Sequence, residues 1–448
     1  MVETRSTDDV RFLNNATKPF QVISLPGVPF DIGEMYAGLI PIDSKNTSRA
    51  LYFVYQPTIG PPVDEATIYS LEGFFQENGR FLWQKGQFAP ELNPYSWVNL
   101  TNMLWVEHLV GTGFSIREVT ATSEEEVAQD FINFFQNFET IFDIKKFKIY
   151  VTGESYTGRY VPYISAAMID KHDRTYFDLA GALTYDPCIG AFDYSQEEAV
   201  TVPFVVESQA IFRLNDSFIA QLSSLDQSCG FAEYRNKFLT FPPVGKQPDD
   251  FFNHKNEEAC DVFNMAFGAA LALNPCFNLY HISETCPLTP DVLGFGSSFR
   301  YTTPRLPVYF DRVDVKNAMH APDVDWSVCS LYPVFIRATG PDDNYQSDTS
   351  LDPIQHVLPP NLDIVIITNG TLLAIQNMTW NGELGFQEQP IMPIIITEPD
   401  LMYESLFNES VLGGVDDPQG TIGHMQPENQ PRLSYRHIQW VLGRVDTL

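Results

Sequence analysis

A serine between two glycines is the first pattern in this sequence that could do chemistry. Ser155 stands in GESYTG at 153–158, after the apolar run KIYVT and before the helix-like stretch RYVPYISAAMIDKH. A serine on a tight turn between a strand and a helix is typical of a nucleophile elbow, in which a strained turn exposes the hydroxyl and small neighbours let the backbone pass close. A Gly-x-Ser pattern alone is common, but this context predicts a nucleophilic serine.

A nucleophilic serine needs a general base and a carboxylate that orients the base, here expected in the chain order Ser, Asp, His. Of the eight histidines, His424 in GHMQP is the best base candidate, because it follows a glycine-rich loop and precedes the last predicted helix. Asp363 starts a late apolar run between Ser155 and His424. A lone histidine is by default a surface or satisfied polar residue, and a turn aspartate is the alternative for Asp363, so spacing alone leaves both open.

Strand-like and helix-like patterns alternate through the first half of the chain. The runs at 50–55, 103–109 and 148–152 predict strands. Between the last two, Ser123 and Glu126 match a capping box, and a stripe of aromatic residues with 3.6-residue spacing follows as far as position 142. This stripe is typical of core packing, and the alternation predicts helices packed on a mostly parallel sheet of the α/β class.

The second half is organised differently. From about 195 to about 310 the sequence is rich in proline, bears cysteines and is irregularly helical, which indicates an insertion or mainly helical cap. Sheet-like sequence returns at 362–368, with 393–397 as a further candidate, and the chain ends in a helix opened by Pro431. We find no internal repeat.

Composition excludes several classes of protein. The chain has 27 Lys+Arg against 57 Asp+Glu, a net charge of −30, so nucleic acid and anionic membranes are poor partners. No apolar run approaches the roughly 18 residues of a membrane span, and we expect a soluble protein with a solvated acidic surface. A phosphate loop, a dinucleotide fingerprint and HExxH are absent from the sequence, so no metal or organic cofactor is expected.

Cysteines and glycosylation sequons favour a secretory protein. Six cysteines show no zinc-like spacing, and four of them fall between Cys229 and Cys286, which predicts a locally disulfide-linked segment whose pairing the spacing leaves open. The N-terminal MVETRSTDDVRFLNN has no apolar core, so we expect no signal peptide in this sequence. N-linked glycans are expected at seven sequons, Asn15, Asn46, Asn99, Asn215, Asn369, Asn377 and Asn408.

These motifs resemble the serine carboxypeptidases over most of the chain. GESYTGRYVPYIS is similar to the family's GESYAGxYxP, while NPYSW and WVEHLVGTGFS resemble its NPYSW and E-P-VGTGFS blocks. NLDIVIITNG resembles the family's aspartate segment, since Asp363 lies seven residues before Gly370, and GHMQPENQP resembles GHMxPxxQP. The resemblance, closest to the fungal secreted branch, implies one α/β-hydrolase domain over 1–448 with a cap at about 195–310. It also implies a triad of Ser155, Asp363 and His424.

The resemblance also implies how the substrate is held. Members of the family cleave C-terminal residues, so the site must recognise a free carboxylate. Glu154 does so in its protonated form, paired with a second buried glutamate at the position of Glu77, and Tyr156 supplies an oxyanion N–H. Two carboxyls held together share a proton, which suits an acid-active peptidase. From the residues alone, Glu77 would be an ordinary exposed helix residue.

The chain departs from the family pattern at two places. The block WLNGGPGCSS normally precedes LEGxxxENG, whereas this chain reads EATIYSLEG at 65–73 and lacks about eight residues. They include the glycine that gives the second oxyanion N–H, and loss of one such donor typically lowers kcat about 10²- to 10³-fold. The family's hydrophobic strand before the histidine is also missing, because VLGGVDDPQGTIG is typical of a loop.

The leading interpretation is a secreted or vacuolar serine carboxypeptidase that releases C-terminal residues at acidic pH. The two alternatives are a catalytically silent secreted homologue and an esterase or acyltransferase on the same triad. Because both gaps are clean while their flanks keep the family pattern, a splicing or gene-model error is a further hypothesis. A transcript that lacks both segments, across 68–69 and 421–422, would contradict it.

Overall fold

The fold is built on one seven-stranded sheet. A computed structural model describes residues 10–43, 46–115, 118–248, 260–295, 307–330, 334–336, 357–358, 366–380, 382–390 and 425–448. The strand order is β1-β2-β6-β3-β7-β8-β9. β1 and β2 form an antiparallel pair, as do β2 and β6, and the remaining pairs are parallel. The strands are β1 (Tyr36–Asp43), β2 (Asn46–Gln56), β3 (Glu65–Ser70), β6 (Asn102–Glu107), β7 (Lys148–Glu154), β8 (Asp178–Tyr185) and β9 (Val357–Leu358).

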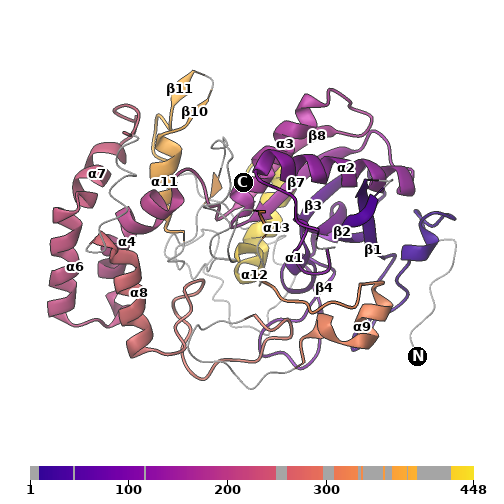
Figure 1. Ribbon diagram of the computed structural model, residues 1–448, viewed down its shortest axis with the longest axis horizontal. Helices are drawn as coiled ribbons and strands as arrows, with labels where there is room; N and C mark the ends of the chain where they lie inside the picture. Colours follow the sequence, from indigo (N-terminus) through magenta and orange to yellow (C-terminus); the bar gives the residue numbers. More distant parts are fainter. Residues whose placement is uncertain are drawn as a thin grey trace.

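Helices cover both faces of this sheet (Figure 1). α2 (Glu124–Phe142) and α3 (Thr157–Asp170) share a hydrophobic cluster with one face. α1 (Leu71–Gln76) and α13 (Pro431–Val441) share a second cluster with the other face, and α12 (Gln426–Asn429) leads into α13. Because both faces are covered, the parallel strands are apolar on both sides, which is why they stand out in the sequence.

The capping box predicted for α2 is half right. The Ser123 hydroxyl accepts a hydrogen bond from Glu126 N at 3.4 Å, as predicted. The Glu126 carboxylate, however, accepts from Thr122 N at 2.7 Å and from Thr122 Oγ1 at 3.0 Å. In a full capping box Glu126 would bond to the backbone N–H of Ser123, whereas here it bonds to Thr122. The first turn of α2 still has side-chain hydrogen bonds from Ser123 and from Glu126.

Two predicted strands differ from the structure. β6 ends at Glu107 rather than at position 109, because the chain turns back and Ser115 Oγ donates to Glu107 O at 2.6 Å. Of the run predicted at 362–368, only 366–368 are described: Ile366 and Ile367 belong to no strand and precede α11 (Thr368–Gln376). Both isoleucines are buried, and a short buried apolar run cannot tell a strand from a helix approach. Positions 362–365 and 393–397 lie outside the described residues.

A group of helices lies to one side of the sheet and has its own hydrophobic cluster (Figure 1). It contains α4 (Ala199–Glu207), α6 (Asp216–Ser228), α7 (Phe231–Phe238) and α8 (Val262–Leu273), and α11 packs against it. Disulfides join Cys229 to Cys260 and Cys276 to Cys286, so the predicted disulfide linking of this segment is confirmed.

The remaining elements are short. They are α5 (Gln209–Phe212), α9 (Val313–Ala318), β4 (Phe81–Leu82), β5 (Glu91–Leu92), β10 (Thr379–Trp380), β11 (Glu383–Leu384), a π-helix (Asp193–Glu198) and 3₁₀ turns at Lys18–Phe20, Trp97–Asn99 and Tyr309–Asp311.

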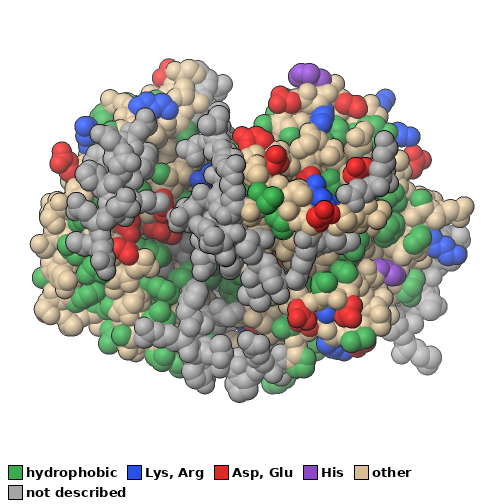
Figure 2. All heavy atoms as spheres, in the orientation of Figure 1, with side chains coloured by type: hydrophobic (Ala, Val, Ile, Leu, Met, Phe, Trp, Pro, Cys, Tyr) green, Lys and Arg blue, Asp and Glu red, His purple; other side chains and the backbone are tan. Residues whose placement is uncertain are grey.

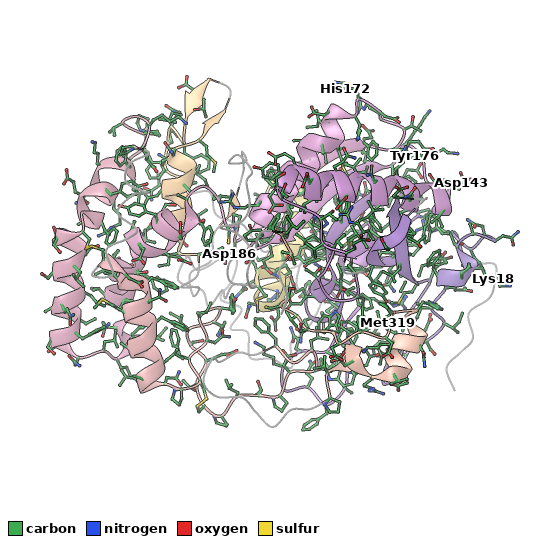
Figure 3. All side chains as sticks on the ribbon, viewed as in Figure 1. Lys18, Asp143, His172, Tyr176, Asp186 and Met319 are labelled. Carbon is green, nitrogen blue, oxygen red and sulfur yellow. A yellow bond between two sulfur atoms is a disulfide. The ribbon has the colours of Figure 1, made fainter. Side chains whose placement is uncertain are left out.

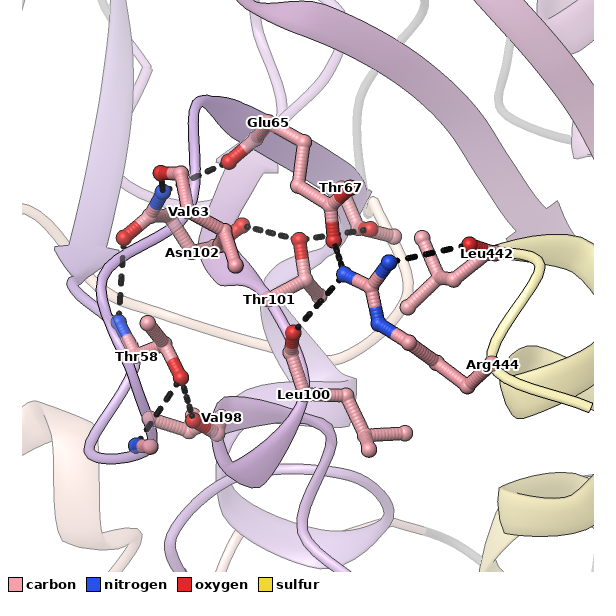
Figure 4. A network of polar contacts seen from close by, with 11 residues as sticks. Thr58, Val63, Glu65, Thr67, Val98, Leu100, Thr101, Asn102, Leu442 and Arg444 are labelled. Atoms are coloured by element: carbon pink, nitrogen blue, oxygen red, sulfur yellow. Dashed lines mark hydrogen bonds and ion pairs between the residues drawn. The ribbon is translucent and has the colours of Figure 1, made fainter.

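A polar network ties the C-terminal helix to the sheet (Figure 4). Arg444 forms an ion pair with Glu65 at the start of β3 and also donates to Leu442 O at 3.0 Å. Asn102 Nδ2 donates to Val63 O at 3.0 Å, and its Oδ1 accepts from Thr58 N at 3.0 Å. The network lies at the amino end of β3. It holds the end of the chain after α13 against the start of this strand.

On the face that Figure 2 shows, the described acidic side chains do not form one dominant patch. Figure 2 shows acidic side chains scattered over the visible face, among fewer basic ones. Such a distribution fits a solvated acidic surface better than a single binding patch for a basic partner. Among the described helices, none is long and apolar enough to cross a membrane.

Candidate active site

Ser155 occupies a strained turn between β7 and α3. Its φ is 62°, in the left-handed region that a residue with a side chain rarely adopts. The two neighbouring glycines allow the close approach: a Cβ on Gly153 would lie 2.5 Å from Thr157 Oγ1, and one on Gly158 2.5 Å from Pro187 Cβ. The turn thus has the geometry of a nucleophile elbow, and the strain holds the serine in place rather than marking a defect.

The backbone of Ser155 is fixed by the end of the neighbouring strand. Ser155 N donates to Tyr185 O at 3.0 Å, and Ser155 O accepts from Cys188 N at 3.0 Å. Asp186, between these two residues, lies between the sheet and the helical group (Figure 3). The serine therefore sits at the carboxyl edge of the parallel strands, the edge at which α/β sheets bind their ligands.

A buried carboxyl group lies close to the elbow. Glu77, at the end of α1, is 2% exposed, so the exposed alternative for this residue is wrong. Tyr69 Oη, from the penultimate residue of β3, donates to Glu77 Oε2 at 2.8 Å. A buried carboxyl without partners costs several kcal/mol, and the phenol removes part of that cost.

Glu77 and Glu154 belong to one electrostatic cluster. Burial raises the pKa of Tyr69 well above its usual value, and the negative charges of Glu154 and Glu77 raise it further. Burial also raises the pKa of Tyr185, which a hydrogen bond with Ser434 lowers and the same two carboxylates raise. Both glutamates therefore act electrostatically on the same two phenols, Tyr69 and Tyr185.

The segment that follows His424 closes on this cluster. Gln426 N donates to Glu154 Oε1 at 2.6 Å, which joins the first residue of α12 to the residue before the nucleophile. Tyr156, whose N–H is the expected oxyanion donor, precedes the first turn of α3. Helix N-termini favour negative charge, so the elbow offers a suitable field for an oxyanion.

Asp363 and His424 lie outside the described residues. The described histidines nearest to the elbow face aromatic rings: His108 contacts Tyr160 at 5.0 Å between ring centroids, and His437 contacts Tyr185 at 5.5 Å. Burial lowers the pKa of His108 to about 3 and that of His437 to about 4, so both are neutral at the expected working pH. None of the described histidines forms a hydrogen bond with Ser155.

The first sequence gap is visible as a direct junction. β3 ends at Ser70 and α1 begins at Leu71, with no turn between them. In the described stretch 46–115, no glycine loop stands at this point to offer a second oxyanion N–H. The six-residue helix α1 follows the strand immediately, and at its end Glu77 accepts the hydrogen bond from Tyr69.

Three residues of the cluster were not predicted from the sequence: Tyr69, Tyr185 and Gln426. The first two are aromatic residues at strand ends, which the pattern assigns to the core. Only the position of Gln426, two residues after His424, offered a signal. Among the described residues, no group of three or more His, Cys, Asp and Glu side chains is arranged to hold a metal.

A strained serine turn at the carboxyl edge of a mostly parallel, helix-covered sheet defines an α/β-hydrolase. A family profile described as serine carboxypeptidase matches residues 26–444. The chain therefore belongs to the serine carboxypeptidase family, as its motifs indicate.

Named relatives agree. "Serine-type carboxypeptidase F" of Aspergillus niger is 52% identical over 482 residues, covering 98% of this chain and 90% of that protein. A "Probable serine carboxypeptidase" of Arthroderma benhamiae is 40% identical over 484 residues, covering 100% and 90%. Both alignments are longer than this chain of 448 residues, so the relatives contain internal segments that it lacks.

The solved structure of a prohormone-processing carboxypeptidase from Saccharomyces cerevisiae matches with a TM-score of 0.69 at 19% identity, covering 96% of each chain. This match confirms the predicted α/β-hydrolase fold.

Proposed function

We propose that this chain releases C-terminal residues from peptides at acidic pH, with Ser155 as nucleophile, His424 as base and Asp363 as the residue that orients His424. The observation that carries the proposal is a carboxyl cluster beside a strained serine: Glu154 precedes Ser155, and Tyr69 ties Glu77 into the same cluster. An exopeptidase needs both a nucleophile and a group that recognises the end of the chain. A simple esterase needs only the first.

In the proposed reaction, His424 accepts the proton of Ser155 Oγ as this oxygen attacks the carbonyl carbon of the last peptide bond. His424 then gives the proton to the leaving amine as the C–N bond breaks, and water hydrolyses the acyl-enzyme. Tyr156 N–H stabilises the oxyanion from the start of α3. At acidic pH Glu154 and Glu77 hold one proton between them, and protonated Glu154 donates a hydrogen bond to the substrate's carboxylate while it keeps the proton.

The described residues support His424 as the base through its neighbour in the chain. Gln426, two residues beyond His424, donates to Glu154, the residue before the nucleophile. We also propose that the helical group beside the sheet is the cap at about 195–310. A chain with two disulfides fits a secreted or vacuolar location, and three sequon asparagines, Asn15, Asn215 and Asn369, are exposed and open to glycosylation.

A catalytically silent homologue is the second candidate, and the direct junction of β3 and α1 favours it. With Tyr156 as the single donor, we expect kcat to be about 10²- to 10³-fold below that of a two-donor enzyme. The longer relatives support a missing segment, and sequencing the transcript across 68–69 and 421–422 tests whether a splicing or gene-model error removed it.

An organophosphate label with a peptidase assay tests the proposal. We expect the label on Ser155 and release of C-terminal amino acids from blocked dipeptides at pH 5, both lost in Ser155→Ala. Labelling without release would indicate an esterase or acyltransferase. A folded protein that takes no label would support the silent homologue.

A further inference from the structure

One lysine lies among three carboxyl groups next to α12. Lys85 Nζ lies 3.4 Å from Glu284 Oε1, and the Lys85 side chain is only 15% exposed. Burial lowers the pKa of Lys85, but the charges of Glu428, Glu284 and Asp291 outweigh burial and raise it overall. We call Lys85, Glu284, Asp291 and Glu428 the Lys85 cluster.

The cluster joins three separate parts of the chain. Lys85 follows β4, and the neighbouring Gly86 N donates to Pro290 O at 2.8 Å. Glu284 lies in the loop closed by the Cys276–Cys286 disulfide, and Asp291 lies just beyond it. Glu428 is in α12. The cluster thus holds α12 against a disulfide-linked loop of the helical segment.

Both sides of the cluster lead to the carboxyl pair. Gln76 Nε2 donates to Asp291 Oδ1 at 3.2 Å, and Gln76 precedes Glu77. On the other side, Glu428 lies two residues after Gln426, whose amide donates to Glu154 Oε1 at 2.6 Å. A displacement of the single turn of α12 would therefore reach the Gln426–Glu154 hydrogen bond directly.

The cluster changes charge within the range of neutral pH. With all four groups ionised, one cation faces three anions. Burial raises the pKa of Glu428 to about 7, Lys85 lowers it, and Asp291 and Glu284 raise it. His281 also faces Lys85 and Glu284, but burial lowers its pKa, so it is neutral at pH 7 and adds no compensating charge. Below pH 7 the cluster therefore holds one anion fewer.

We propose that Glu428 is a positioning residue: in its neutral form it lets α12 rest on the Lys85 cluster, and when ionised it loosens α12 and withdraws the Gln426 amide from Glu154. The inference deepens the proposed function, because this movement sets an upper pH limit on recognition of the substrate's carboxylate. A glutamate with a raised pKa stabilises its surroundings fully below about pH 4.5, and this contribution is lost as the pH rises through 7.

Hydrogen exchange of the full-length protein tests the inference without reference to activity. After correction for the intrinsic exchange rate, the wild-type Gln426 amide and the first turn of α13 should lose about tenfold in protection between pH 5 and pH 8, since one pH unit beyond the pKa corresponds to a tenfold change. Glu428→Gln should change by less than about twofold over the same interval.

Two further variants complete the design. Glu428→Met cannot ionise either and should behave as Glu428→Gln does, which separates charge from hydrogen bonding. Asp314→Asn, in an exposed ion pair with Arg312, is the matched control and should retain the wild-type pH dependence. An equal loss of protection in wild type and in both Glu428 variants would overturn the inference.

If the protein is active, KM should show the same effect. Above pH 7 we expect KM for blocked dipeptides to rise about tenfold in the wild type with a smaller change in kcat, and to stay low in Glu428→Gln. A KM that rises equally in both proteins would contradict the inference. Absence of activity would count against the proposed function alone, since the exchange result stands without it.

Discussion

Tyr69 donates its phenolic hydrogen to Glu77 Oε2 across 2.8 Å, so the end of β3 holds a buried carboxyl at the end of the helix that follows it. β3 and α1 join directly at Ser70 and Leu71, so only a short stretch of chain separates the phenol from the carboxyl.

Removal of this phenol should weaken the carboxyl cluster. Tyr69→Phe removes the hydrogen bond from Tyr69 to the buried Glu77, and we expect a loss of about 1–3 kcal/mol in the free energy of unfolding. The KM for peptide substrates should rise, while labelling of Ser155 persists. Urea unfolding and dipeptide kinetics check this, with Tyr176→Phe, far from Asp186 in Figure 3, as control.

The elbow should not tolerate a methyl group. A Cβ at Gly158 would lie 2.5 Å from Pro187 Cβ and 2.7 Å from Cys188 O, so Gly158→Ala must displace the loop that fixes Ser155. We expect a loss of about 2 kcal/mol or more in stability and the loss of organophosphate labelling. Gly268→Ala is the control, because nothing lies within 4 Å of a Cβ added there. Alanine favours a helix over glycine, so this change in α8 should raise the free energy of unfolding by about 0.5–1 kcal/mol. Unchanged labelling of Gly158→Ala would show that the elbow is looser than the contacts indicate.

Stability should fall as the pH rises, because several glutamates are buried. Burial and then the charge of Asp173 raise the pKa of Glu139 to about 9, and among its described contacts neither carboxyl oxygen has a hydrogen-bond partner. The stability that this group contributes is complete below about pH 4.5 and is lost as the pH rises to about 9.

The side chain in Glu139→Gln cannot ionise. Between pH 5 and pH 8 the wild type should therefore lose about 2–4 kcal/mol more of its free energy of unfolding than this variant loses. Urea unfolding followed by tryptophan fluorescence at both pH values measures this difference. The exposed Glu383 serves as control through Glu383→Gln. An identical pH dependence for Glu139→Gln and wild type would refute the prediction.

The ion pair at the C-terminal end should anchor α13. Arg444→Met leaves Glu65, which is 6% exposed, without its cation at the start of β3. Because Arg444 itself is about one third exposed, we expect a moderate loss of about 1–2 kcal/mol. Reversal of the loss by Glu65→Gln in the double mutant would show that the uncompensated carboxylate causes it.

Three of the seven strands, the helix α2 and the nucleophile can be predicted from the sequence, because local patterns determine them. β2, β7 and α2 follow from periodicity, and Ser155 follows from the strand, turn and helix around it. The last residues of the strand predicted at 362–368 were assigned wrongly, since the buried Ile366 and Ile367 suit a strand and the approach to α11 equally well. Gln426 could not be found for a different reason: its partner Glu154 is distant in the chain, so only tertiary packing gives Gln426 a role. Tyr69 was missed although Glu77 is only eight residues away, because the pattern assigns an aromatic residue at a strand end to the core.

The direct connection from β3 to α1 makes the protein a natural acceptor for a grafted loop. Both flanking elements are already in place, and a loop inserted between Ser70 and Leu71 would leave the sheet at its carboxyl edge, beside the elbow. A glycine-rich insert at this junction would have to release the Tyr69–Glu77 contact in order to fit. The first of the two gaps can therefore be addressed by adding residues at one peptide bond, without redesign of the core.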